Sequence, residues 1–249
     1  MVSQSASRNA QLARSGSWGV KVSLKRKFMW GRARISCVIL AIAFVTCTAI
    51  SARAQDAATN IEIGKNEIGA PPGEFELPTL GDGRQGLWTV VRDATAKTGI
   101  AIEQAGVQTT EERFPLAIYR PVSLKNAEIS LRLNATGGKS DQGGGVAVRL
   151  SSPQNYYLVQ LDALKDRVLF SRVSNGASEE IVGIDADIAS HSWHTLTVRA
   201  KDDEFVVSLD GIWVFTGFDK TLSRAGRIAL WTKGDSVTRF DQIEIAPLP

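Results

Sequence analysis

Outside its first 54 residues the sequence contains no cysteine. Both cysteines, Cys37 and Cys47, lie in a single N-terminal apolar stretch. Disulfides, thiol catalysis and cysteine-ligated metals are therefore excluded for the chain after residue 54. A domain in that part of the chain has to be stabilised by its hydrophobic core, and 249 − 54 = 195 residues are enough to form one.

Acidic side chains are absent from residues 1–54, which carry nine of the 29 Lys and Arg residues. The other 195 residues hold 29 − 9 = 20 basic and all 26 acidic side chains, which gives a net charge of −6. A protein that binds nucleic acid needs a basic surface to neutralise phosphates. The mildly acidic body of this chain therefore predicts that nucleic acid is not a partner.

The apolar run of 16 residues at 35–50 falls short of the roughly 20 residues that cross a bilayer. It follows a basic stretch and precedes Ala52-Arg53-Ala54, small residues in the positions that signal peptidase requires. The pattern predicts a cleaved signal peptide over residues 1–54. If translation starts at Met29, the signal peptide has an ordinary length. The mature protein would begin at Gln55, would be periplasmic or extracellular, and would not be attached to a membrane. The alternative is that the segment is not cleaved and anchors the protein.

The exported part divides into a polar linker, residues 55–72, and a domain over residues 73–247. In the domain, apolar runs of about five to eight residues alternate with turn residues, which is typical of an all-β sandwich. The pattern predicts a two-sheet antiparallel jelly roll, with one helical turn near residues 220–224. The predicted strands are 75–79, 87–92, 99–104, 114–120, 127–133, 144–151, 155–162, 167–174, 178–183, 194–200, 204–210, 212–217, 225–232 and 238–246.

One hairpin can be placed in register from the sequence. With residues 151–154 as its loop, Val148 faces Tyr157, and Arg149 faces Tyr156 on the other side of the sheet. Gln160 follows Tyr156 on that second side, so Arg149, Tyr156 and Gln160 are predicted to share one surface. The next strand, 167–174, is apolar on both faces, and its register stays open.

Several catalytic patterns are missing. The sequence has no G-x-x-x-x-G-K-S/T, G-x-S-x-G or H-E-x-x-H string. The run Gly143-Gly144-Gly145 is therefore interpreted as a bulge or a close approach of two backbones. His191 and His194 lack a further zinc ligand nearby, so His194 is predicted to be structural.

Three segments carry a family resemblance: the run from Asp141 to Gly176, the segment SWHTLTVRAKDDEFVVSLDG, and the segment GRIALWTKGDSVTRFDQIEI. They resemble exported bacterial domains of the concanavalin A-like lectin/glucanase superfamily, in particular its laminin-G-like and 3-keto-disaccharide-hydrolase-like branches. The resemblance covers about residues 86–246 and implies a jelly roll associated with glycan binding or glycoside chemistry. Retaining glucanases of this superfamily carry E-x-D-x-x-E on one strand. No such string occurs here, which argues against that kind of glucanase.

Five residues are candidates for contacting a saccharide: Arg149, Tyr156, Gln160, Trp231 and Lys233. If Ile228 and Leu230 face the core, Trp231 and Lys233 face outward, and an indole beside polar groups suits a sugar. The alternative, favoured by the usual burial of Trp in sandwiches, is that Trp231 is a core aromatic and Lys233 a surface charge.

No cofactor is expected. Asp141 and Asp235, near strand ends, are weak candidates for Ca²⁺ ligands, because Ca²⁺ prefers oxygen donors. Three functions stay open: an exported glycan-binding domain without an assigned catalytic set, a hydrolase or lyase acting on 3-keto-glycosides, and a structural or protein-interaction module. The oligomeric state and the particular glycan cannot be predicted from the sequence.

Overall fold

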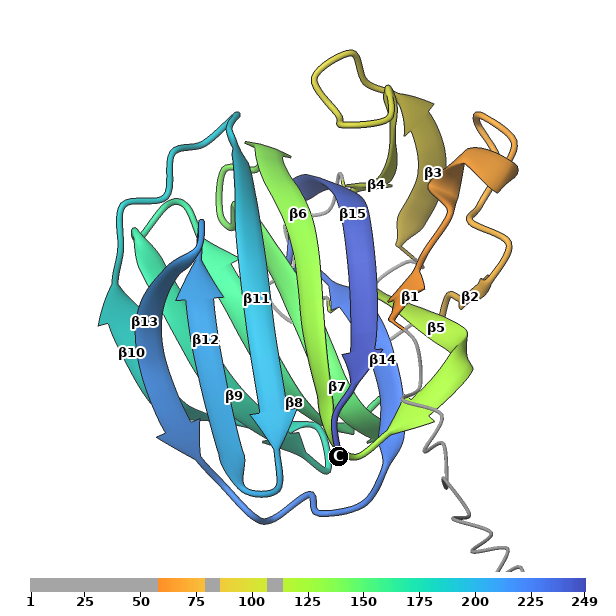
Figure 1. The fold of residues 1–249 in the computed structure, drawn as a ribbon. Helices are drawn as coiled ribbons and strands as arrows, with labels where there is room; N and C mark the ends of the chain where they lie inside the picture. Colours follow the sequence, from red (N-terminus) through yellow and green to blue (C-terminus); the bar gives the residue numbers. More distant parts are fainter. Residues whose placement is uncertain (1–57, 79–85, 107–113) are drawn as a thin grey trace, which may run out of the picture. The chain divides into compact units, whose positions relative to one another are not determined.

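The computed structural model describes residues 58–78, 86–106 and 114–249, and the predicted signal peptide lies outside these residues. No helix in the described ranges is long and apolar enough to cross a membrane. The described residues form two antiparallel sheets, which confirms the predicted β-sandwich (Figure 1). Side chains alternate along each strand, so one face of each sheet supplies the shared core.

Sheet A has the strand order β13-β12-β11-β6-β15-β4-β3, with β1 paired to β15. Figure 1 shows β13, β12, β11, β6 and β15 side by side. The bounds of its strands are β1 Thr59–Asn60, β3 Leu87–Arg92, β4 Ile100–Ala105, β6 Ala127–Gly137, β11 Trp193–Lys201, β12 Glu204–Leu209, β13 Ile212–Phe218 and β15 Val237–Pro247.

Sheet B has the order β10-β9-β8-β7-β14-β5-β2. Its strands are β2 Phe75–Glu76, β5 Leu116–Leu124, β7 Gly143–Ser152, β8 Asn155–Asp162, β9 Arg167–Ser174, β10 Ala177–Asp185 and β14 Gly226–Trp231. The sequence prediction placed a strand at each of β2 to β15. The helical turn predicted at 220–224 was wrong, since that segment consists of bends.

The main core lies between the two sheets. Sheet B contributes Tyr157, Val159 and Phe170, and sheet A contributes Phe205 and Phe240, among others. The rings of Phe170 and Phe205 lie 4.6 Å apart, and so do those of Tyr157 and Phe205. These contacts across the sheets match the apolar alternation that the sequence showed.

Part of the segment expected to be a linker packs on the domain. Residues 59–60 form β1 beside β15, and a short 3₁₀ helix, η1 (Ile63–Lys65), follows. Ile61 and Ile63 are buried in the main core. Because only two apolar residues are involved, this stretch has no periodicity that would distinguish it from a linker.

Candidate functional site

The outer face of sheet B, turned away from the core between the sheets, carries the candidate site. On β8, Tyr157 and Val159 point into the main core, whereas Tyr156 and Leu158 belong to a second cluster on the outer face. Gln160 continues this outer row. The predicted alternation of the hairpin is thereby confirmed for β8.

A groove of about 700 Å³ lies on this outer face. This volume is within the range of small-molecule sites in proteins. Four of the five predicted ligand residues line it. Its lining residues are Phe114, Pro153, Gln154, Tyr156, Leu158, Gln160, Leu169, Ser171, Val173, Gly176, Ser178, Glu180, Trp231 and Lys233.

Strand register brings Trp231 and Gln160 to the two sides of one glycine. Trp231 pairs with Gly145 between β14 and β7, and Gly145 pairs with Gln160 between β7 and β8. A Cβ atom at Gly145 would collide with the carbonyl oxygen of Val159. The interpretation of the glycine run as a close backbone approach is therefore confirmed, and Gly145 itself is buried and is not among the residues that line the groove.

Aromatic side chains form one wall of the groove. Trp231 belongs to the outer-face cluster of sheet B and is only 4% exposed, which agrees with the favoured interpretation of a buried aromatic. The ring of Phe114 stacks on it at 6.2 Å with an interplanar angle of 17°. Tyr156 is 3% exposed, and burial raises the pKa of its hydroxyl to about 12, a shift that the Trp231 side chain opposes. Tyr156 is therefore neutral near pH 7 and acts as an apolar surface with a polar tip.

Both charged residues of the groove are paired. Lys233 Nζ lies 2.9 Å from Asp141 Oδ1, and Glu180 Oε1 lies 3.1 Å from Arg167 Nη2. Lys233 therefore differs from the free surface charge that the alternative interpretation assumed. The pairing leaves the groove with polar groups but without an uncompensated charge in its lining.

The loop that carries Asp141 is held by Asp235. The Asp235 carboxylate accepts hydrogen bonds from the backbone N–H groups of Lys139 (2.8 Å), Ser140 (3.1 Å) and Asp141 (2.9 Å). Burial opposes ionisation of this carboxyl, but the backbone N–H donors outweigh it and hold the pKa of Asp235 below its ordinary value. The side chain thus fixes the backbone from which Asp141 reaches Lys233.

These contacts do not fit the suggested Ca²⁺ site. Both Asp235 oxygens accept backbone N–H donors, and Asp141 is paired with Lys233. Within the described residues, no group of three or more His, Cys, Asp or Glu side chains is arranged to hold a metal ion. The two carboxylates organise the loop instead of converging as ligands.

Arg149 is the predicted site residue that the structure places elsewhere. The hairpin keeps the predicted register up to Val148 and then shifts through a β-bulge, so that Ser152 pairs with Asn155 around a tighter turn. Arg149 lies in the bulge with φ 51° and does not face Tyr156. The prediction of a shared surface was wrong because an extra residue in one strand reverses the alternation of faces.

The Arg149 side chain is 2% exposed and closes one end of the sandwich. Its Nε donates to the carbonyl of Lys125 at 2.8 Å and its Nη1 to that of Leu222 at 3.3 Å. Its guanidinium lies 5.1 Å from the Phe205 ring centroid and 5.9 Å from that of Tyr157. These contacts assign Arg149 to the core rather than to the groove.

Histidine and the other polar clusters lie away from the groove. His194 Nδ1 is 2.8 Å from Asp210 Oδ2, and its Nε2 is 3.1 Å from the carbonyl oxygen of Ala189. Both ring nitrogens are therefore engaged in holding the start of β11, in agreement with the structural role predicted for His194.

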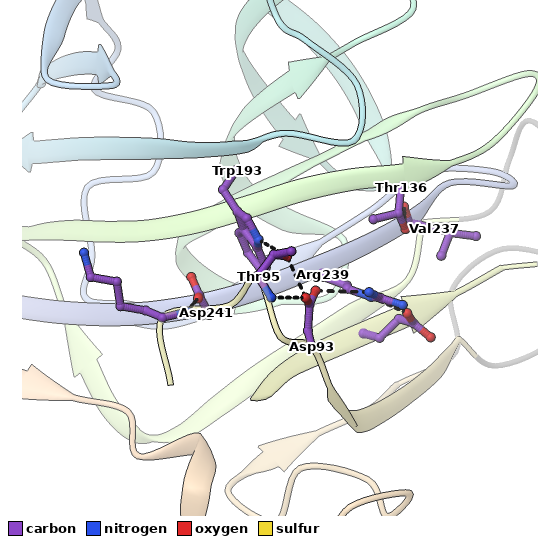
Figure 2. Close-up of polar contacts among 9 residues, drawn as sticks. Asp93, Thr95, Thr136, Trp193, Val237, Arg239 and Asp241 are labelled. Atoms are coloured by element: carbon purple, nitrogen blue, oxygen red, sulfur yellow. Dashed lines mark hydrogen bonds and ion pairs between the residues drawn. The ribbon is translucent and has the colours of Figure 1, made fainter. Parts of the chain in front are cut away.

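A polar network on sheet A ties the turn after β3 to β15 (Figure 2). Thr95 Oγ1 donates to Asp93 Oδ1 at 2.6 Å and accepts from Trp193 Nε1 at 2.9 Å, and Asp93 Oδ2 accepts from Arg239 at 3.0 Å. Asp241 accepts from the backbone N–H of Lys97 at 2.7 Å. Burial raises the pKa of Asp241. These contacts stabilise the turn, while Asp241 Oδ1 is buried without a hydrogen-bond partner among the described residues.

Sequence reasoning missed the β9 and β10 side of the groove. Ser171 and Leu169 point outward because Leu158 pairs with Ser171 and Gln160 with Leu169. Strand β9 is apolar on both faces, so no polarity pattern could set this register. Once β8 is placed, the pairing partners of its outer residues identify these positions.

Comparisons with known proteins agree with the fold. No family model matches the chain, and no curated protein matches its sequence. Among solved structures, the carbohydrate-binding module CBM66 from Bacillus subtilis is similar with a TM-score of 0.55 and 20% identity over 70% of this chain and 97% of that one. A protein of unknown function with a galectin-like fold, also from Bacillus subtilis, has a TM-score of 0.50 and 7% identity over 70% and 89%.

Domain 4 of AbnA, a GH43 extracellular arabinanase from Geobacillus stearothermophilus solved in complex with arabinotriose, is similar with a TM-score of 0.50. The identity is 14%, covering 76% of this chain and 90% of that one. Identities of this size show a shared fold and leave function to the site itself. The likeness shows a shared β-sandwich fold.

Proposed function

We propose that this chain is an exported carbohydrate-binding domain, and that it takes up a neutral saccharide in the groove on the outer face of sheet B. The observation that carries the proposal is the aromatic wall of Trp231 and Phe114, which lines the same groove as the amide of Gln160. Sugars offer C–H faces that pack on aromatic rings and hydroxyls that need directed hydrogen-bond partners.

The charge pairing supports a neutral ligand. Because Asp141 compensates Lys233 and Arg167 compensates Glu180, an acidic sugar would find no unpaired cation in the described lining. The similarity to a carbohydrate-binding module and to a domain solved with arabinotriose supports the same class of ligand.

A binding role is favoured over the 3-keto-glycoside hydrolase or lyase. Glycoside hydrolysis commonly uses two carboxyl groups that flank the scissile bond. Among the described residues that line the groove, Glu180 is the single carboxylate and none is a histidine. Glu180 is also held by Arg167 near the exposed edge of the sheet rather than beside Trp231.

The test is a binding screen of the purified full chain against arabinan, xylan, mixed-linkage β-glucan, galactan and polygalacturonan. The neutral polymers contain the expected ligand, and polygalacturonan should not bind. Replacing a tryptophan that anchors a ligand costs about 2 kcal/mol or more, so Trp231→Ala should weaken binding by roughly 30-fold.

Trp213→Ala is the matched control, because Trp213 is 63% exposed on β13 of the other sheet. Since Trp231 is buried, its variant must also be checked for folding by circular dichroism. Equal affinity of the folded Trp231→Ala variant and the wild-type protein would contradict the proposed site. Lack of binding to all neutral polymers would favour the structural or protein-interaction module.

A further inference from the structure

The groove is lined by residues of β8, β9 and β10, with Trp231 of β14 on its far side, and no residue of β7 is among its described lining residues. From β14 to β10 there are four inter-strand spacings of about 4.8 Å, which make about 19 Å. The two ends of the groove, at β14 and at β10, can be compared.

At the β14 end the groove is closed. The stacked rings of Trp231 and Phe114 form a wall there. Beyond them on β5, the outer-face side chains of Leu116 and Ile118 are fully buried and take no part in the lining. Among the described residues, the lining ends at this wall and does not continue over β5.

At the β10 end the groove is open. Strand β10 is the edge of sheet B, with no further strand beside it in the described order. Its lining residues Ser178 and Glu180 are exposed, as is Gly176 in the turn before it. The groove is therefore open at this edge, as it is over the exposed Gln154 of the β7–β8 turn.

We infer that the groove recognises the end of a saccharide chain, with the terminal sugar against the wall of Trp231 and Phe114 and the rest of the chain leaving across β10. The inference rests on the carbohydrate-binding function proposed above. The terminal ring lies beside Gln160, and the Lys233 ammonium on its Asp141 support offers donors to the terminal hydroxyls. Ser171 and Ser178 lie along the path of the following sugars.

The experiment changes the number of chain ends without changing the sugar. Arabinan, xylan, mixed-linkage β-glucan and galactan are each cut partially with their endo-hydrolases, and the new ends are counted by a reducing-sugar assay. Isothermal titration calorimetry with the full chain then gives the number of binding sites per mass of polymer. For the polymer that binds, the number of sites should rise by the same factor as the number of ends.

Two outcomes would overturn the inference, and they differ in what they say of the proposed function. If a polymer binds but its number of sites stays constant as ends multiply, the groove binds chain interiors, and only the end recognition is wrong. If no polymer and no fragment binds, the proposed function and the inference fail together.

A variant at the open edge provides a second test. Ser178→Trp places a large side chain where the ligand is expected to leave. The affinity for longer fragments should then fall several-fold relative to the affinity for the disaccharide of the same polymer. Ser192→Trp, at an exposed position in the turn before β11, is the matched control. An unchanged ratio of the two affinities in Ser178→Trp would contradict an exit across β10.

Discussion

Trp231 and Gln160 face one groove from opposite sides of Gly145, because each of them pairs with that glycine through a neighbouring strand. An apolar ring and an amide are thereby carried on strands that are two strand spacings apart, about 10 Å, and both side chains line the groove. This relationship between strands of different hairpins defines where the terminal ring of a sugar can lie.

Gln160→Ala should weaken saccharide binding without unfolding the domain. Gln160 is partly exposed and lines the groove, so the variant removes a hydrogen-bonding amide and leaves no large cavity. A hydrogen bond between neutral groups contributes about 0.5–1.5 kcal/mol, which corresponds to binding weaker by roughly 2- to 13-fold. Titration calorimetry against the polymer identified in the screen measures the change, with Ser192→Ala as the surface control. A variant that binds as tightly as the wild-type protein would remove Gln160 from the site.

Arg149→Ala should lower stability and leave the affinity for saccharide unchanged. The sequence alone suggested the opposite, but the side chain donates to the carbonyls of Lys125 and Leu222 and lies over core aromatic rings. Hydrogen bonds of a charged donor contribute about 1.5–3 kcal/mol each, so a loss of roughly 2–4 kcal/mol in the free energy of unfolding is expected.

Denaturant unfolding measures this loss in Arg149→Ala, with Arg224→Ala as the control. Arg224 lies exposed in the loop that also contains Leu222, so the control tests whether removing any arginine near this loop lowers the free energy of unfolding. Equal stability of both variants, or a binding defect in Arg149→Ala at full stability, would contradict the assignment of Arg149 to the core.

Asp235→Asn should lower the free energy of unfolding at neutral pH. It should also make the free energy of unfolding fall less steeply as the pH is lowered. The pKa of Asp235 is lower in the folded protein than in the unfolded chain, so its ionised form stabilises the fold above the unfolded pKa of about 3.9. In the wild-type protein this contribution disappears as the pH falls from about 4 through the lower folded pKa. Denaturant unfolding between neutral pH and about pH 2 should show a shallower acid slope in Asp235→Asn.

Asp235→Asn also tests whether the loop held by Asp235 supports the Lys233–Asp141 pair in saccharide binding. If Asp235 positions the loop that carries Asp141, Asp235→Asn should also weaken saccharide binding, because the backbone that supports the Lys233–Asp141 pair loosens. Asp187→Asn, at a carboxylate between β10 and β11, provides the control for loss of one negative charge. Identical acid slopes in the wild-type protein and Asp235→Asn would be inconsistent with the proposed anchoring.

Cleavage of the leader is expected after Ala54. Small residues at positions 52 and 54 follow an apolar run too short to cross a membrane. N-terminal sequencing of the secreted protein should therefore give Gln55 as the first residue, and Ala54→Arg should block processing. A mature chain that retains Arg32 or Arg34 would show that the leader remains attached.

The sequence by itself determined the strands β2 to β15 and the outward direction of Tyr156 and Gln160, whereas it left Trp231 open between an outward and a core position. Alternation with a period of two is a local property, and a buried sheet requires it of each strand separately. The sequence also predicted the close backbone approach at the glycine run correctly, because residues without a Cβ atom allow neighbouring backbones to come close.

Only the tertiary structure decided where Arg149 lies, which β9 residues enter the groove, and that the groove is closed at one end. A bulge adds one residue to one strand and leaves no distinct mark in the alternation, so the sequence predicted the wrong face for Arg149. Strand β9 is apolar on both faces, so its register depends on β8 and not on its own pattern. The closed end arises where Phe114, distant in sequence, stacks on Trp231, a contact between strands that no local pattern specifies.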